Sequence, residues 1–537
     1  MHRGDVMPPE ELLAKKIGEE FHCVGEWWIP DKKEHKPQRK YSGTLAFTPG
    51  EGIVLRIMGQ FESEKPFGPL DFSHFKMICG RSTEDELISL YECQSAGSSI
   101  GKFSAESYSI TAVFVSKDAW LTPDEAIAFK SLRLEFSHLG EWVGVSTIRP
   151  KFDQSDEATN VGVSYEPSKT FPPILVGDYD ISLNSGYLFQ LRGTPIQRAV
   201  LEQATSFTIK RQASKEISLD EVHKLVRGVQ DFLSLSMYDE PIYPLVIEGA
   251  VEIERGTRPD VTMRLLYERL GTKKPSEKIL THDTPFSYKD VADVWQGALG
   301  EMIFARDEEL KPVLNEFFAE HYSPSAFVED RFMAIIRTIE AFHRRTCETD
   351  SYVEKEVWKK DYCPTLYKQV EQAVKEVPLS GNLRDSFLAS LRSRVEYGYQ
   401  YSLRKRLDNL FDSQYGEDFL TLFAGRRGNE RLKKAMEEAE TAEEQETKRK
   451  QWIKEQRSDF VYATVKARNW FTHFDEDDKP EALIGGPGLE WLNRKLRLFM
   501  AALLLDRINV PSEQVKNIFR HHKFSYLQKT DEIESLR

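Results

Sequence analysis

The pattern of hydrophobic and polar residues changes its period along this chain. From Phe21 to about Ile148, short runs alternate apolar and polar residues or are rich in β-branched and aromatic residues, which is typical of β-strands. A polar stretch follows as far as Pro173, and strand-like runs then resume. From about Ser287, apolar residues recur every three or four positions, which predicts helices. The expected fold class is α+β, with a sandwich-like β-rich N-terminal half in two subdomains, followed by an all-α helical bundle.

Local signals support this division. Pro49-Gly50-Glu51-Gly52 separates two strand-like runs and predicts a hairpin. Ser218-Leu-Asp-Glu221 is a capping box that should open a helix. Two later runs predict a strand pair joined at Thr257-Arg258-Pro259-Asp260. Because strands resume after the polar stretch, we expect two β-rich subdomains rather than one sheet. The predicted domains are residues 1–155, 156–285 with a helix, a helical connector 286–322 and a helical domain 323–537.

Composition narrows the class of protein. Of 537 residues, 40% are hydrophobic and 30% are charged, as in ordinary globular proteins. No apolar run has the length of a membrane span, and the first residues lack the apolar core of a signal peptide, so we expect a cytoplasmic protein. The five cysteines are widely spread without a C-x-x-C pair, which argues against disulfides and structural zinc. We expect no metal and no cofactor. The net charge of −13 argues against a general nucleic-acid binder but permits a selective enzyme with a local basic site.

The most informative run extends from Arg457 to Phe474, RSDFVYATVKARNWFTHF. Its apolar residues recur at helical spacing, and they are Phe460, Ala463, Ala467, Trp470 and Phe471. Asn469 and His473 project about 40° apart on such a helix, with Arg468 beside them. A neutral imidazole can move a ribose 2′-hydroxyl proton, an arginine fork can hold a phosphate, and an amide can orient either partner. The cluster therefore suits RNA cleavage without a metal.

The Arg/His spacing alone does not decide the matter. Arg133 and His138 have the same spacing in a strand-like run, where we interpret the pair as structural. Arg337 and His343 lie on a predicted helix but lack the asparagine. A satisfied pair on a helix surface would explain any one of them.

Charged segments nearby are interpreted as solvated. The charge-dense stretch 426–457 predicts a solvated helix or an insertion before the motif helix. The acidic run Asp475 to Asp478 could hold a metal, but it is more typical of a solvated turn. One further set predicts a locally basic face: Arg392, Arg394, Arg404, Lys405 and Arg406.

Longer motifs resemble a known family. KARNWFTHF, late in an all-helical region, resembles the R-x(4–6)-H motif of HEPN domains. In the N-terminal half, four motifs resemble the signature of the N-terminal region of Apea-type anti-phage proteins; they are Gly25-Glu26-Trp27-Trp28-Ile29-Pro30, Gly43-Thr44-Leu45, Ile53 to Gly59, and Leu139-Gly140-Glu141-Trp142. Together the two similarities cover most of the chain. In physical terms, we expect Trp27, Trp28 and Trp142 to be packing residues.

The resemblance implies a function. Apea-type proteins carry a C-terminal HEPN domain, so it implies an abortive-infection effector whose HEPN endoribonuclease cuts RNA, with tRNA as the predicted substrate. It implies a homodimer, or a higher homo-oligomer, in which two motif helices meet in a composite site, with Arg468, His473 and Asn469 as catalytic residues. Glu340, on the first long helix of the bundle, is the candidate supporting carboxylate; a helix-surface carboxylate paired with Arg337 or Arg344 is the alternative. The products would carry 2′,3′-cyclic phosphate ends.

The N-terminal half would sense infection or restrain the nuclease, with a phage-derived component as the expected trigger and no membrane partner. The alternative is a non-catalytic scaffold that binds RNA or protein, in which the β-rich half binds a phage component.

Overall fold

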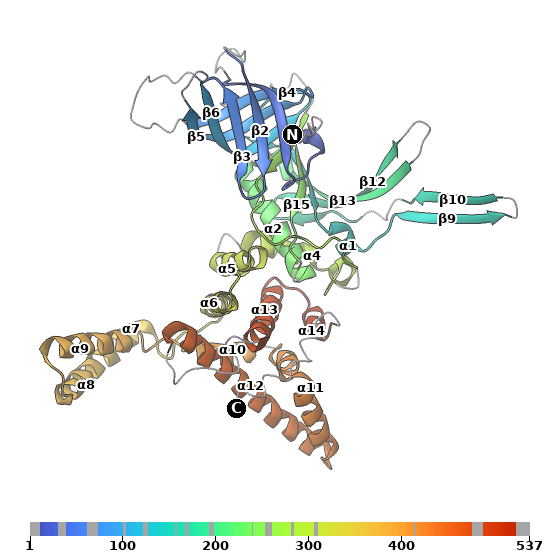
Figure 1. Ribbon diagram of the computed structural model, residues 1–537. Helices are drawn as coiled ribbons and strands as arrows, with labels where there is room; N and C mark the ends of the chain where they lie inside the picture. Colours follow the sequence, from blue (N-terminus) through green and yellow to red (C-terminus); the bar gives the residue numbers. More distant parts are fainter. Residues whose placement is uncertain are drawn as a thin grey trace, which may run out of the picture. The chain divides into compact units, whose positions relative to one another are not determined.

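A computed structural model shows two compact units, Met1–Phe304 and Ala305–Arg537 (Figure 1). The predicted boundaries at 155, 285 and 322 stay predictions. The structure describes residues 11–30, 39–61, 74–99, 104–121, 127–155, 158–166, 171–192, 198–238, 240–252, 260–280, 284–305, 310–412, 415–474 and 487–521.

Six antiparallel strands at the start of the N-terminal unit form a closed sheet. They are β1 (Phe21–Trp28), β2 (Tyr41–Thr48), β3 (Gly52–Met58), β4 (His74–Ser82), β5 (Leu87–Ser99) and β6 (Ala105–Ser116). The ring closes because β6 pairs with β3 on one side and with β5 on the other. Buried and exposed residues alternate along β1, so one side faces the interior of the ring. The predicted β2–β3 hairpin is confirmed, and a closed ring takes the place of the expected sandwich.

The same sheet continues beyond the ring. The added strands are β16 (Val261–Tyr267), β15 (Pro244–Val251), β8 (Ser131–Phe136), β13 (Arg198–Arg211), β12 (Tyr179–Arg192) and β11 (Ile174–Val176). They follow in that order from β6, so β8 lies between strands that come after the polar stretch. The expectation of separate sheets is therefore wrong, because strand pairing joins segments on both sides of residue 155. Two short pairs stand apart: β9 (Ile148–Ser155) with β10 (Ala158–Tyr165), and β7 (Ala128–Phe129) with β14 (Ile217–Ser218).

Short helices complete this unit. They are the 3-10 turns η1 (Leu12–Ala14) and η2 (Gln212–Ser214), and α1 (Leu139–Val143), α2 (Leu219–Met237), α3 (Tyr288–Val291) and α4 (Trp295–Ala305). The capping box of α2 is confirmed, with Ser218 and Glu221 bonded reciprocally. Trp142 is fully buried, and its ring packs edge-on against Phe232 and Tyr288. Trp27 and Trp28 are buried too, so all three tryptophans are packing residues as predicted.

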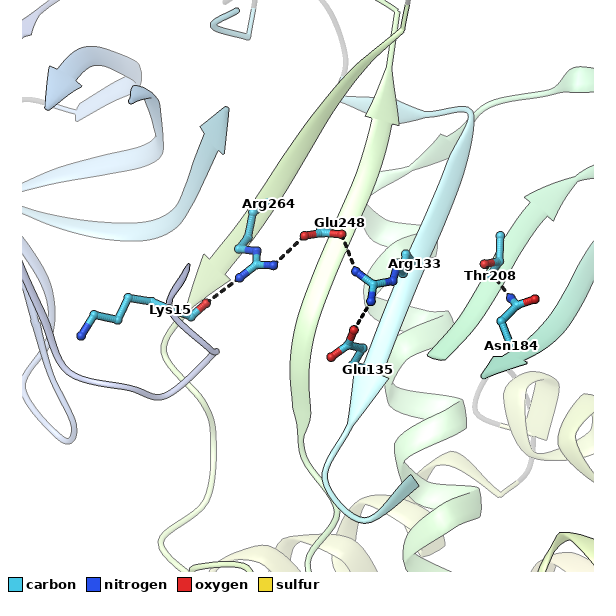
Figure 2. Close-up of polar contacts among 7 residues, drawn as sticks. All are labelled: Lys15, Arg133, Glu135, Asn184, Thr208, Glu248 and Arg264. Atoms are coloured by element: carbon cyan, nitrogen blue, oxygen red, sulfur yellow. Dashed lines mark hydrogen bonds and ion pairs between the residues drawn. The ribbon is translucent and has the colours of Figure 1, made fainter. Parts of the chain in front are cut away.

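A polar network crosses three neighbouring strands of the sheet (Figure 2). Glu248 of β15 accepts hydrogen bonds from Arg133 of β8 at 2.9 Å and from Arg264 of β16 at 2.6 Å. Arg133 also pairs with Glu135, and Arg264 donates to the carbonyl of Lys15. Burial would raise the pKa of Glu248, but the two guanidinium groups hold it below its ordinary value. The Arg133 side chain therefore bonds within the sheet, which agrees with the structural role predicted for it.

A close glycine contact in this unit provides a stability test. A Cβ atom at Gly80 of β4 would lie 2.2 Å from Cε3 of the fully buried Trp27. We expect Gly80→Ala to lower the free energy of unfolding by about 1–3 kcal/mol, because the ring or the strand must move. Gly186 of β12 has no atom within 4 Å of its built Cβ position, so Gly186→Ala is the matched control. Equal denaturation midpoints for the two variants, followed by circular dichroism, would contradict this packing.

The C-terminal unit is helical, as predicted. Its helices are α5 (Lys311–Tyr322), α6 (Val328–Thr346), α7 (Lys355–Val357), the π-helical turn η4 (Trp358–Tyr362), α8 (Cys363–Glu376), α9 (Gly381–Glu396), α10 (Leu403–Phe411), α11 (Gly416–Glu437), α12 (Ala442–His473), α13 (Pro487–Arg507) and α14 (Ser512–Arg520). Four buried rings join α10, α11, α12 and α13. They are Phe411, Phe419, Phe460 and Phe499, with centroids 4.7–5.5 Å apart.

Two charged segments differ from expectation in detail. The stretch 426–457 is helical, the first of the two alternatives predicted for it, and not an insertion. It forms the end of α11 and the first half of α12, and its part from Ala442 is continuous with the motif helix. The predicted basic face is wrong for Arg406, which is fully buried. Arg392 lies on α9, where it pairs with Glu371.

Candidate functional site

The last three turns of α12 have one buried and one solvent-facing side. The predicted apolar stripe is confirmed, because Phe460, Ala463, Ala467 and Trp470 are all buried. The ring of Phe471 packs at 6.0 Å against Phe332 near the start of α6. Further back, Arg457 ties α12 to α10 through ion pairs at 2.9 Å with Asp408 and 2.7 Å with Asp412. The end of α12 is therefore fixed at two levels within the bundle.

The three candidate catalytic residues gather at this end of α12. Arg468 projects about 140° round the helix from His473, yet its Nη1 donates to Oδ1 of Asn469 at 3.4 Å. Arg468 and Asn469 are half-buried and His473 is exposed. His473 is the last residue of α12, and Phe474 follows in the left-handed conformation at φ 52°. The carbonyls that end a helix favour a positive charge beside them.

No carboxylate pairs with Arg468 within the part of the chain that the structure describes. Its guanidinium therefore keeps donors for a ligand, and a phosphate oxygen is a suitable acceptor. The imidazole of His473 is open to solvent at the end of the same helix. The arrangement combines a proton-transfer group with an anion-binding group, which is what phosphodiester transfer requires.

Glu340 lies deeper along α6. It is half-buried and comes eight residues after Phe332, a step of roughly 12 Å along a helix. Since Phe332 is the residue that meets Phe471, Glu340 lies away from the end of α12. Burial lowers the pKa of Arg406, and the charge of Glu340 is one of those that oppose this shift. Its supporting role in the site stays a prediction.

The second Arg/His pair on a helix is divided between two environments. Arg337 is exposed and bonded to Glu316 at 2.6 Å. His343 is fully buried, with Nδ1 3.3 Å from Nη1 of Arg406 and Nε2 3.2 Å from the side-chain amide of Asn409. Burial, aided by the Arg406 charge, lowers the pKa of His343 to about 4. The pair is therefore not one site.

The cluster of His343, Arg406 and Asn409 was not anticipated from the sequence. Arginine only donates, so Nδ1 of His343 accepts from Arg406 and the proton of the neutral ring sits on Nε2. Asn409 then accepts from Nε2 through its amide oxygen, which requires the amide oxygen and nitrogen to exchange places. Nη2 of Arg406 has no hydrogen-bond partner among the described residues. No local signal could have found the cluster, because 63 residues separate His343 from Arg406.

Two further expectations concern metals and membranes. Across the described ranges, no three histidine, cysteine or acidic residues gather as metal ligands would. The acidic run from Asp475 to Asp478 lies outside the described residues, as does the predicted turn at residues 257–259. None of the helices that the structure describes combines the length and apolar character of a membrane crossing.

Comparison with protein families identifies both halves of the chain. Residues 22–302 match the model of ApeA N-terminal domain 1. The chain belongs to the ApeA family. Residues 333–514 of this ApeA-family protein match the Apea-like HEPN model. The comparisons with curated proteins and with solved structures gave no match.

The family matches confirm the resemblance found in the sequence. The HEPN match contains Glu340, Arg468, Asn469 and His473. HEPN domains are generally ribonucleases, so this ApeA-family protein is a defence-related HEPN protein, and an endoribonuclease is supported at the level of the family.

Proposed function

We propose that this ApeA-family protein is a cytoplasmic abortive-infection effector that cleaves RNA, with tRNA as the substrate, without a metal. The observation that carries the proposal is the end of α12. There α12 carries an exposed imidazole and, about 140° round the helix, a guanidinium that no described carboxylate neutralises, within the HEPN match. The net charge of −13 fits a selective nuclease rather than a general RNA binder.

In the proposed reaction, His473 takes the proton of a ribose 2′-hydroxyl. The 2′-oxygen then forms a bond to the adjacent phosphorus, and the bond from phosphorus to the 5′-oxygen breaks. The leaving 5′-oxygen takes up a proton from an imidazolium. The products are a 2′,3′-cyclic phosphate and a 5′-hydroxyl. Arg468 holds the phosphate and stabilises its developing charge, while Asn469, already bonded to Arg468, orients that guanidinium.

Two proton transfers call for two imidazoles, and a two-fold dimer supplies them. Each motif helix then faces its own copy, so one His473 acts as the base and the other as the acid in a composite site. Glu340 is proposed to support this site through the negative charge that its carboxylate places in the helical bundle. The N-terminal half is proposed to sense a phage-derived trigger or to restrain the nuclease until one arrives.

The chemistry predicts which substrates and additives change the rate. We expect cleavage of RNA to persist in EDTA, because no step uses a metal. We expect a substrate with a single 2′-deoxyribose at the cleaved position to resist, because that site then lacks the nucleophile. Mass spectrometry of the products should show 2′,3′-cyclic phosphate ends. Loss of cleavage in EDTA, or cutting at the deoxyribose, would exclude this mechanism.

A further inference from the structure

A row of four residues runs along the solvent-facing side of α12 and ends at His473. Tyr462, Lys466, Asn469 and His473 fall within an arc of about 60° at 100° per residue. Tyr462 and His473 are exposed and Lys466 and Asn469 are half-buried, whereas the buried residues of the same turns lie further round the helix. The row therefore extends the face of Asn469 and His473 by about two turns towards the start of the helix.

The basic residues of α12 differ in how they are neutralised. Towards the start of the helix, Arg449 pairs with Glu417, and Lys450 pairs with Glu446 at 3.4 Å. Arg457 is held by two aspartates. Within the described ranges, Lys454, Lys466 and Arg468 have no such carboxylate. Two of these three cations lie within the last two turns before His473, where a polyanion would need positive charge.

Tyr462 is an exposed aromatic side chain on this row. It keeps 48% of its surface exposed, whereas Phe460 and Trp470 of the same helix are buried. The ammonium group of Lys466 lies 5.8 Å from its ring centroid, so the two side chains are adjacent. A phenol ring beside an ammonium group is the combination on which an unpaired base stacks while its phosphate is bound.

We infer that Tyr462 and Lys466 bind the unpaired nucleotides that flank the cleaved bond. This inference rests on the proposed ribonuclease function, and it names the substrate class as RNA that is single-stranded beside the cleavage site. Lys466 and Tyr462 lie roughly 10 Å and 16 Å along the helix axis from His473, which corresponds to a few nucleotides of an extended strand. A paired base is already stacked within its duplex, so double-stranded RNA cannot stack a base on the ring of Tyr462.

The test measures RNA binding by the full-length protein and its variants. The probe is a fluorescently labelled single-stranded RNA, compared with the same RNA annealed to its complement. We expect Tyr462→Ala to weaken binding of the single strand about tenfold and Tyr462→Phe to leave it unchanged, because stacking needs the ring but not the hydroxyl. We expect Lys466→Ala to weaken binding and to reduce the slope of log affinity against log salt by about one.

Matched controls lie elsewhere in the same unit. Tyr397→Ala removes a ring that is 57% exposed at the end of α9. Lys450→Ala removes a lysine of α12 that is already paired with Glu446. Both should bind RNA as the wild type does.

Several outcomes would overturn the inference. The wild-type protein could fail to bind single-stranded RNA, or it could bind the duplex equally well. The variants at 462 and 466 could also bind RNA as tightly as the control variants do. A changed oligomeric state in Tyr462→Ala with unchanged RNA binding would assign this face to contact between copies instead.

The two proposals fail separately. If His473→Ala loses cleavage while the Tyr462 and Lys466 variants bind and cleave normally, the nuclease stands and the flanking site is wrong. If Tyr462→Ala loses binding while His473→Ala cleaves at the wild-type rate, the RNA-binding face stands and the catalytic assignment is wrong.

Discussion

Replacing His473 by alanine is expected to lower the rate of RNA cleavage by at least about a hundredfold, the usual contribution of a positioned general acid or base. His473 is exposed at the last position of α12, so its removal should leave the fold intact. In a composite site the loss is larger, since both copies lose the imidazole at once. RNA binding should persist, because Arg468 still holds the phosphate.

The measurement is single-turnover cleavage of labelled RNA, supported by sequencing of RNA ends in cells under phage challenge. His22→Ala is the control, because His22 is an exposed histidine of β1 in the other unit. Arg468→Ala should lower both binding and cleavage, since phosphate binding and charge stabilisation are lost together. Glu340→Gln belongs in the same series: an unchanged pH profile of cleavage would remove Glu340 from the site. Wild-type cleavage by His473→Ala would leave the non-catalytic scaffold as the better explanation.

Acid is expected to destabilise the protein through the other histidine, His343. Its pKa is about 4 in the folded state against an ordinary 6.5. Between these two pKa values, His343 is protonated in the unfolded chain but neutral in the folded chain. The free energy of unfolding therefore falls as the pH drops from 6.5 towards 4. The full contribution is about 3 kcal/mol, from the difference in pKa. The physical cause is burial, together with the Arg406 guanidinium that already occupies Nδ1.

The comparison that isolates this effect is His343→Gln. A glutamine amide oxygen can accept from Arg406, but the side chain does not titrate. Since both proteins carry the same carboxylates, the difference between their unfolding free energies across this pH range reports the imidazole alone. His473→Ala should keep the wild-type pH dependence of stability. A wild type and a His343→Gln variant that lose stability in parallel would show that His343 is not held neutral by the fold.

The two histidines show how far sequence could lead. His473 is predicted as a site residue because its helix has a strong apolar period, which places Arg468, Asn469 and His473 on known sides of one element. His343 has similar neighbours in sequence, and the same reasoning treated it as a weaker copy of the motif. What separates them is burial by α10, a helix some sixty residues away, and periodicity carries no information about which distant element will cover a face.

The sheet shows the same division. Alternation located β1, the β2–β3 hairpin and the β15–β16 pair, because each is specified by side chains within a few residues of one another. It did not reveal that β6 closes a ring by pairing with both β3 and β5, or that β8 joins strands from beyond residue 155. Several neighbours satisfy the hydrogen bonds of a strand equally well, so packing of the whole unit selects among them.

The amino-acid sequence by itself determined the order of strand and helix, the buried stripe of α12 and the family to which its motifs point. Those features depend on side-chain period and local chemistry, which neighbouring residues carry. The tertiary structure alone decided that Arg406 is buried against His343 and that Arg337 is exposed whereas His343 is buried. It also decided that Tyr462 and Lys466 lie on the same uncovered side of α12 as His473. Each of these features depends on which helix surfaces are buried by other elements, and this is fixed only when the whole unit folds.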